Sequence, residues 1–180
     1  MLSRVREAIF DRLAPWLPLT EVPPGEAARV LDLFAGSGSL GIEALSRGAA
    51  HARFVERGRA ARETLAGNLA ALGLESRAEL TDADALGPRA AQADAPFDVV
   101  FFDPPYPLLD EPGTRAKLFA TVTRLVLGAE GHPPALAEDG VLVFHAPTDT
   151  LEPTEFDGDL EVAHKAWGTT EIWFVGRRED

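Results

Sequence analysis

A glycine-rich stretch, Asp32-Leu-Phe-Ala-Gly36-Ser-Gly38-Ser-Leu-Gly41, decides the fold. An apolar run precedes it over residues 29–34 and a helical pattern follows it over residues 39–47, so the glycines are predicted to lie in a turn between a buried strand and a helix. Their spacing is G-x-G-x-x-G, and Glu56 follows Gly36 by 20 residues at the end of the next predicted strand. This arrangement is typical of a nucleotide-like ligand bound at the carboxyl edge of a parallel sheet.

Strands and helices are predicted to alternate outward from this turn. The expected helices cover 3–13, 39–47, 59–72 and 114–127, and the expected strands cover 29–34, 52–56, 78–82, 98–103, 141–146, 161–167 and 171–177. Repeated strand-helix-strand units predict an α/β fold whose parallel sheet has helices on both faces. The last two strands, joined at Gly168, are expected to form an antiparallel hairpin, and Trp167 and Trp173 on them are expected to be core residues.

The composition is that of one globular domain, which we expect to span residues 1–180, with residues 1–25 as an N-terminal helix and connector. Of the 180 residues, 46% are hydrophobic and 26% are charged, enough apolar surface to build a core. No apolar stretch approaches the roughly 18 residues of a membrane span, and residues 1–12 lack a signal-peptide core, so a cytoplasmic protein without membrane association is expected. The sequence contains no cysteine, which excludes disulfides, thiolate nucleophiles and cysteine-ligated zinc. The four histidines show no ligand spacing, so no metal is expected.

The charge is unevenly distributed. The net charge of −12 argues against a nucleic-acid ligand. However, residues 1–62 contain nine arginines and seven acidic side chains, whereas residues 63–180 contain eight basic and 22 acidic ones. If a polyanion binds, the first third of the chain is the expected side.

The electrostatics of the glycine turn decide between two classes of ligand, a dinucleotide and S-adenosylmethionine. A dinucleotide would place its phosphates at the helix N-terminus, where Asp32 would repel them. S-adenosylmethionine has no phosphate and carries an ammonium and a sulfonium; a carboxylate about 4 Å from one of these contributes up to ~4 kcal/mol at an effective dielectric near 20. Asp32 therefore favours the methyl donor, although a carboxylate that only caps the loop remains an alternative.

Other residues are predicted to complete the donor site. Glu56 would accept hydrogen bonds from both ribose hydroxyls, or would be only an exposed charge at a strand end. In Asp82-Ala-Asp84-Ala85, one carboxylate would accept the adenine amino group; Asp84 is preferred, and a solvated acidic turn is the alternative. The full predicted donor set is Asp32, Phe34, Ala35, Gly36, Gly38, Glu56, Asp84 and Ala85.

A second motif, Asp103-Pro104-Pro105-Tyr106, ends the most apolar strand. Two prolines fix φ and remove two N–H donors, so the turn presents carbonyls, a carboxylate and an aromatic ring rigidly. Hydrogen bonds from an exocyclic amine to Asp103 and to the Pro104 carbonyl would aim its lone pair at a methyl group, and Tyr106 would stack on the base. These four residues are the predicted catalytic set, with Asp103 also accepting the released proton.

Taken together, the motifs resemble the RsmD-like 16S rRNA guanine-N2 methyltransferases. The resemblance rests on these segments: Val5-Arg-Glu-Ala-Ile-Phe10, Asp32 to Gly41, Glu43-Ala-Leu-Ser-Arg-Gly48, Phe54-Val-Glu56 and Asp103 to Tyr106. It implies a single-domain, Rossmann-like class I methyltransferase fold with a seven-stranded, mostly parallel sheet. It also implies S-adenosylmethionine as the donor and a guanine of small-subunit rRNA, in an assembled or assembling subunit, as the acceptor. Arg4 and Arg6 would lie near the RNA, and a monomer is expected.

Three other functions remain open. Family members carry a further N-terminal segment that supports substrate binding, and in this sequence that segment is expected to be absent. Related turns serve methylation of adenine N6 in DNA and of glutamine in proteins. The third alternative is a non-catalytic module that binds S-adenosylmethionine and stabilises a partner.

Overall fold

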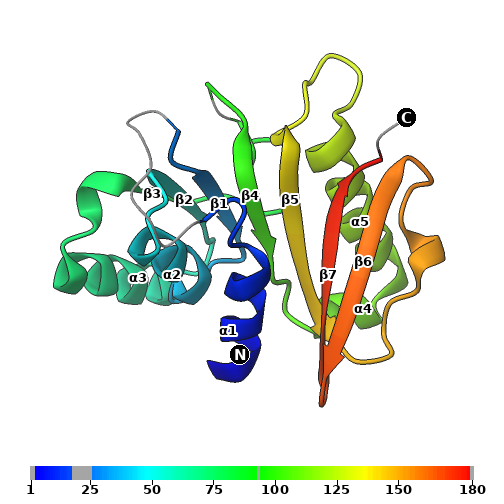
Figure 1. Cartoon of the computed structure of the whole chain (residues 1–180), viewed down its shortest axis with the longest axis horizontal. Coiled ribbons are helices and arrows are strands. Elements are labelled where there is room, and N and C mark those ends of the chain that lie inside the picture. Colours follow the sequence, from blue (N-terminus) through cyan, green and yellow to red (C-terminus); the bar gives the residue numbers. More distant parts are fainter. Residues whose placement is uncertain (1–2, 18–25, 93, 179–180) are drawn as a thin grey trace. The chain divides into compact units, whose positions relative to one another are not determined.

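Strands and helices alternate through the residues that the computed structural model describes, which are 3–17, 26–92 and 94–178 (Figure 1). They group into two units, residues 1–90 and residues 91–180. The described residues contain seven strands, and the last two form an antiparallel hairpin. These features confirm the predicted α/β fold with its C-terminal hairpin.

The first unit is built on three parallel strands. Its elements are α1 (Ser3–Arg12), β1 (Arg29–Leu33), α2 (Ser39–Ser46), β2 (His51–Val55), α3 (Arg59–Leu72), the 3-10 helix η1 (Glu75–Arg77) and β3 (Ala78–Thr81). The strand order is β3-β2-β1, and both pairs are parallel. Helix α2 packs against β1 and β2, and α3 packs against β3. The carboxyl ends of all three strands therefore meet at one edge, where the loops after β1 and β2 lie side by side.

Helix α3 begins and ends where the sequence predicts. Leu65 and Leu69 are buried and form one apolar stripe, whereas Leu72, at the last helical position, is 59% exposed. Gly73 follows with φ of 67°, and the next amide, that of Leu74, donates to the Leu69 carbonyl. A left-handed glycine of this kind satisfies the last carbonyls of a helix.

The second unit is a mixed sheet. Its elements are β4 (Phe97–Phe102), α4 (Pro107–Asp110), α5 (Pro112–Leu127), β5 (Leu136–Pro147), the 3-10 helix η2 (Pro153–Glu155), β6 (Leu160–Trp167) and β7 (Thr170–Arg177). The strand order is β4-β5-β7-β6, with β4 parallel to β5 and the remaining pairs antiparallel. Helix α5 packs against β5, β7 and β6, and α4 packs against α5 (Figure 1).

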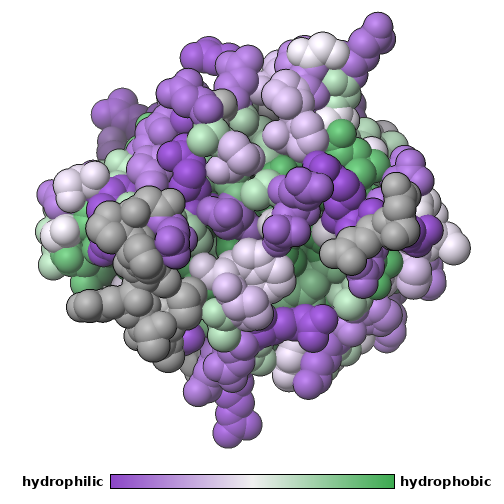
Figure 2. Space-filling model, turned by 45° about the horizontal axis from the view of Figure 1, so that its top comes forward, coloured by the Kyte–Doolittle hydropathy of each residue, from purple (hydrophilic) through white to green (hydrophobic). Residues whose placement is uncertain are grey.

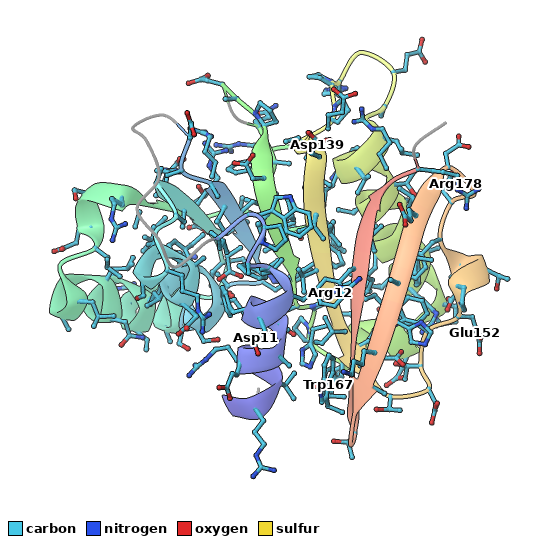
Figure 3. The ribbon with its side chains drawn as sticks, in the orientation of Figure 1. Asp11, Arg12, Asp139, Glu152, Trp167 and Arg178 are labelled. Atoms are coloured by element: carbon cyan, nitrogen blue, oxygen red, sulfur yellow. The ribbon has the colours of Figure 1, made fainter. Side chains whose placement is uncertain are left out.

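Aromatic side chains fill the space between α5 and this sheet. Phe156 stacks on Trp173 with ring centroids 5.1 Å apart, and Phe119 meets Phe156 edge to face at 5.1 Å. Trp173 is 1% exposed, which confirms it as a core residue. Trp167 is different. It lies at the end of the β6–β7 hairpin (Figure 3), is only half-buried, and has the Lys165 ammonium 5.2 Å from its ring centroid, so the prediction that it belongs to the core is wrong.

Strand β5 and the short helices α4 and η2 of the second unit differ from the prediction. Strand β5 begins at Leu136 rather than at residue 141, because the polar Glu138 and Asp139 interrupt the apolar pattern while the backbone continues to pair with β4 through a register shift. The single-turn helix α4 was not predicted, since four residues are too few to show a helical period. The other ends agree within two residues, the usual fraying of element boundaries.

Within the described part of the chain, no helix combines the length and the apolar character that crossing a membrane requires. Figure 2 shows one face of the molecule, on which hydrophilic residues predominate and hydrophobic ones are scattered between them.

Candidate functional site

The loop after β1 is held to α2 by a buried carboxylate. Asp32, the fourth residue of β1, is 2% exposed, and its Oδ2 accepts a hydrogen bond of 2.9 Å from the Gly41 amide. The first amides of a helix lack partners within the helix, and Gly38 at the N-cap has no side chain to offer them. Asp32 therefore caps α2 from the neighbouring strand, where the positive end of the helix dipole favours its charge. This is the capping role left open by the sequence; a contact with a methyl donor stays a prediction.

Close packing requires the glycine at position 41. A Cβ built there would lie 2.3 Å from the Phe54 ring and 3.1 Å from Asp32 Oδ2. Any larger residue would therefore displace either the aromatic ring on β2 or the capping carboxylate. The third glycine of the motif thus sets the distance between helix and sheet.

Three residues of the same loop adopt left-handed backbone conformations: Phe34, Gly36 and Gly38, with φ of 61°, 55° and 85°. A Cβ at Gly38 would lie 2.2 Å from Leu65 Cδ1, so this glycine permits the contact with α3. At Gly36, by contrast, a Cβ would meet nothing nearer than the Phe34 carbonyl at 4.0 Å. Gly36 therefore has open space above it, into which a ligand can approach the backbone.

Glu56 connects the two neighbouring loops. Its Oε2 accepts from the Gly36 amide at 3.0 Å, and its Oε1 accepts from the Gly58 amide at 2.6 Å. Both carboxylate oxygens of Glu56, which is predicted to bind the ribose of the donor, thus already accept from backbone amides. An ionised carboxylate has about four lone-pair sites, so hydroxyl donors can still bind it. The sequence did not predict that Glu56 also fixes the shape of the glycine loop.

The two carboxylates after β3 have different partners. Asp82 forms a two-pronged ion pair with Arg62, with both nitrogen–oxygen distances at 2.9 Å. Asp84 is exposed, and its Oδ1 accepts from the Leu86 amide at 3.0 Å, which closes a local turn. The neighbouring Ala85 is buried. With Asp82 paired to a guanidinium, Asp84 remains the better candidate for an adenine contact.

The Asp103–Tyr106 turn follows the carboxyl end of β4. Pro104 is buried, whereas Pro105 is exposed and Tyr106 is 43% exposed. The carbonyls of Pro105 and Tyr106 accept from the first amides of α4, at 2.9 Å each. The turn thus joins a buried proline to an exposed aromatic ring.

One contact of this turn has no signal in the sequence motifs. His145 of β5 is 5% exposed, its Nδ1 lies 2.5 Å from Asp103 Oδ1, and its Nε2 lies 3.4 Å from the Tyr106 hydroxyl. Asp103 and His145 are 42 residues apart, so spacing alone gives no sign of the pair. A signal exists only in the register: Phe102 pairs with Phe144 in parallel strands, and Asp103 and His145 come next on each.

The arginines predicted to lie near RNA are both on α1. Arg4 is exposed, and Arg6 is partly exposed, with its Nε 4.0 Å from a carboxylate oxygen of Glu43 on α2. Val5 and Ile9 form the buried face of α1. The exposed residues of this helix include the acidic Glu7 and Asp11 as well as Arg4. The described residues contain no group of three or more histidines and acids able to hold a metal ion.

Comparisons with known proteins identify the family. The family model described as conserved hypothetical protein 95 matches residues 1–176. The chain belongs to this family. It is the family of RsmD-like methyltransferases that the sequence resembles, so that prediction is confirmed.

Individual relatives agree with the assignment. The putative rRNA methyltransferase YlbH of Bacillus subtilis is 35% identical over 179 residues, which cover 98% of this chain and 86% of YlbH. The ribosomal RNA small subunit methyltransferase D of Escherichia coli is 43% identical over 104 residues, which are 58% of this chain and about half, 48%, of that protein. The solved structure of the putative methyltransferase yhhF from Escherichia coli has a TM-score of 0.75 at 28% identity, covering 99% of this chain and 89% of that one. The family's methyltransferase fold is therefore present here.

Proposed function

We propose that the protein transfers a methyl group from S-adenosylmethionine to the exocyclic N2 of a guanine in 16S rRNA. The observation that carries this proposal is the Asp103–Tyr106 turn, whose two prolines lie between a carboxylate and an exposed aromatic ring and supply backbone carbonyls. Membership of the methyltransferase family supports the reaction, and the printed names of YlbH and of the Escherichia coli enzyme support rRNA as the substrate.

The loop after β1 fits a cationic donor without phosphates. Asp32 brings a buried negative charge to this loop, and the open space above Gly36 allows close approach to the backbone. Glu56 adds a second carboxylate, whose Oε2 lies 3.0 Å from the Gly36 amide nitrogen. We propose that Asp32 attracts the charged end of the donor, that Glu56 accepts from its ribose hydroxyls and that Asp84 accepts from its adenine amine. Phe34, Ala35, Gly38 and Ala85 complete the proposed donor site.

The Asp103–Tyr106 turn is the proposed acceptor site. A guanine amino group has two N–H donors and a lone pair delocalised into the ring, so it is a poor nucleophile. Asp103 and the Pro104 carbonyl would each accept one N–H, which aims the nitrogen lone pair, and Tyr106 would stack on the base, a contact of ~1–3 kcal/mol. Rotation of the acceptor is thereby restricted before reaction, the source of most of the proposed acceleration.

The proposed chemistry is one displacement and one proton transfer. The donor supplies a methyl group on a sulfonium, whose neutral thioether is the leaving group. The guanine nitrogen forms the new N–C bond while the C–S bond breaks, and the bonding pair leaves on sulfur. The nitrogen then loses one proton, and Asp103 is the proposed base. Arg4 and Arg6 would contribute phosphate contacts, which are mainly electrostatic and weaken with salt.

The test compares two variants that differ only in where an aspartate is removed. Asp103→Ala removes the proposed base, and Asp110→Ala removes the exposed aspartate of α4 as a matched control. Both are incubated with labelled S-adenosylmethionine and small ribosomal subunits from cells that lack this methylation, followed by nucleoside analysis. We expect N2-methylguanosine from the wild type and from Asp110→Ala and none from Asp103→Ala. Binding of S-adenosylhomocysteine should be nearly equal in all three.

Other results would redirect or overturn the proposal. N6-methyladenosine from a DNA substrate, or methylated glutamine in a protein substrate, would replace the acceptor. Tight donor binding without any methylated product would favour a non-catalytic module. A wild-type rate in Asp103→Ala would remove Asp103 from the mechanism.

A further inference from the structure

We propose that His145 is a positioning residue for methyl transfer: it holds both the Asp103 carboxylate and the Tyr106 ring in the orientation that the acceptor base needs. The inference rests on the proposed function of the Asp103–Tyr106 turn. Nothing in the sequence motifs points to His145, because the contact is made through strand pairing.

The three side chains form a connected group. His145 Nδ1 lies 2.5 Å from Asp103 Oδ1, while its Nε2 lies 3.4 Å from the Tyr106 hydroxyl, within reach of a long hydrogen bond. The Tyr106 and His145 rings also meet edge to face, with centroids 5.7 Å apart. One imidazole thus contacts both groups that the proposed mechanism requires on the acceptor side.

The difference in burial indicates that His145 restricts the rotation of the other two side chains, Asp103 and Tyr106. The side chain of His145 is 6% exposed and that of Asp103 is 33% exposed, while Tyr106 is 43% exposed. As a whole residue, His145 is 5% exposed and pairs in register with Ile172 of β7, which is fully buried. A close-packed imidazole has little rotational freedom, whereas a carboxylate and a phenol at the surface would otherwise rotate. The ordered residue is therefore His145.

The proton positions follow from the partners. An ionised Asp103 accepts only, so Nδ1 of His145 carries a proton in both the neutral and the charged imidazole. In the neutral ring, Nε2 then accepts from the Tyr106 hydroxyl. Because His145 Nδ1 donates to Oδ1 of Asp103, Oδ2 is the carboxylate oxygen proposed to accept from the substrate amine. Loss of the partner that orients a metal-ligating side chain costs about 10–100-fold in activity, and we expect an effect of the same order for the partner that orients Asp103.

Three substitutions separate hydrogen bonding from packing. His145→Asn places an amide N–H close to the position of Nδ1 and can still donate to Asp103. His145→Gln places its amide near the position of Nε2 instead, and His145→Leu retains bulk without hydrogen bonding. For each variant, kcat and KM for the small subunit, binding of S-adenosylhomocysteine and the unfolding temperature are measured.

We expect His145→Leu and His145→Gln to lower kcat by about 10–100-fold, with donor binding unchanged. His145→Asn should keep kcat within a few-fold of the wild type. If the leucine variant does not fold, the asparagine and glutamine variants still decide, because both are polar and differ mainly in where the amide lies. Wild-type kcat in both the leucine and the glutamine variants, or loss of activity only in step with lowered unfolding temperature, would overturn the role of His145.

Failure of the wider proposal gives a different pattern. A folded wild type that methylates no acceptor would overturn both proposals together. A wild type that yields N2-methylguanosine, with His145 variants equally active, would overturn only the positioning role.

Discussion

Replacement of Glu56 by glutamine tests how the donor loop is held. In the wild type, the two carboxylate oxygens accept from the Gly36 and Gly58 amides, at 3.0 and 2.6 Å. Glutamine keeps one acceptor oxygen and turns the other into an NH₂ donor. One of the two backbone amides then faces a donor instead of an acceptor. The substitution changes hardly any volume, so its effect reports hydrogen bonding and charge.

The expected cost can be worked out from these two contacts. A hydrogen bond to a charged group contributes about 1.5–3 kcal/mol, and an unsatisfied amide adds a desolvation penalty if it cannot reach water. Glu56 is half-buried, so water compensates in part. We therefore expect Glu56→Gln to lower the free energy of unfolding by about 2 kcal/mol. Glutamine also weakens the proposed charge-assisted hydrogen bond from a ribose hydroxyl, which contributes about 1.5–3 kcal/mol. Since ~1.4 kcal/mol is tenfold in affinity, we expect a Kd for S-adenosylhomocysteine at least about tenfold weaker.

Urea unfolding and titration calorimetry measure the two effects, with Glu63→Gln as the matched control. Glu63 makes an exposed i,i+4 ion pair with Arg59 on α3, at 2.8 Å, with the two side chains 65% and 86% exposed. Exposed pairs of this kind contribute about 0.3–0.5 kcal/mol, so the control should unfold almost as the wild type and bind the donor product equally well. If the Glu56 variant behaves like this control, Glu56 neither holds the loop nor contacts the ribose.

Two further predictions concern stability. Gly38→Ala should lower the free energy of unfolding by about 2–4 kcal/mol, because alanine would adopt a left-handed conformation and its Cβ would lie 2.2 Å from Leu65. Gly67→Ala in the interior of α3, where a Cβ meets nothing within 4 Å, should instead stabilise the protein slightly. Urea midpoints of the two variants that move in the same direction would contradict this prediction. Burial raises the pKa of Glu155, but hydrogen bonds from the Arg115 side chain, at 2.6 and 2.7 Å, and from a backbone amide lower the pKa below its ordinary value of 4.5. A carboxylate whose pKa is lower in the folded state stabilises the fold at pH values above its unfolded-state pKa, and this effect is lost as the pH falls through its folded-state pKa. The stability difference between wild type and Glu155→Gln should therefore be present at pH 7 and shrink below pH ~4. A difference independent of pH would refute the pairing of Glu155 with Arg115.

Several features followed from the sequence because they depend on neighbouring residues. The strand-turn-helix unit around Gly36 and Gly38 follows from an apolar run, a glycine spacing and a helical period within about 20 residues. The Asp103–Tyr106 turn follows from two prolines that fix their own backbone. The ends of α3 follow from its apolar stripe and from Gly73, whose left-handed conformation ends the helix.

The tertiary structure decided the contacts that join distant segments. Which side chain meets Asp103 depends on β5 lying beside β4 and on their register, and a shift of one residue would turn His145 to the other face of the sheet. The sequence predicts Glu56 either as a ribose ligand or as an exposed charge at a strand end, whereas the side-by-side loops after β1 and β2 make it a bridge between Gly36 and Gly58. A single sequence records local propensity strongly, but it records strand order and register only weakly, because those are fixed when the whole core packs at once.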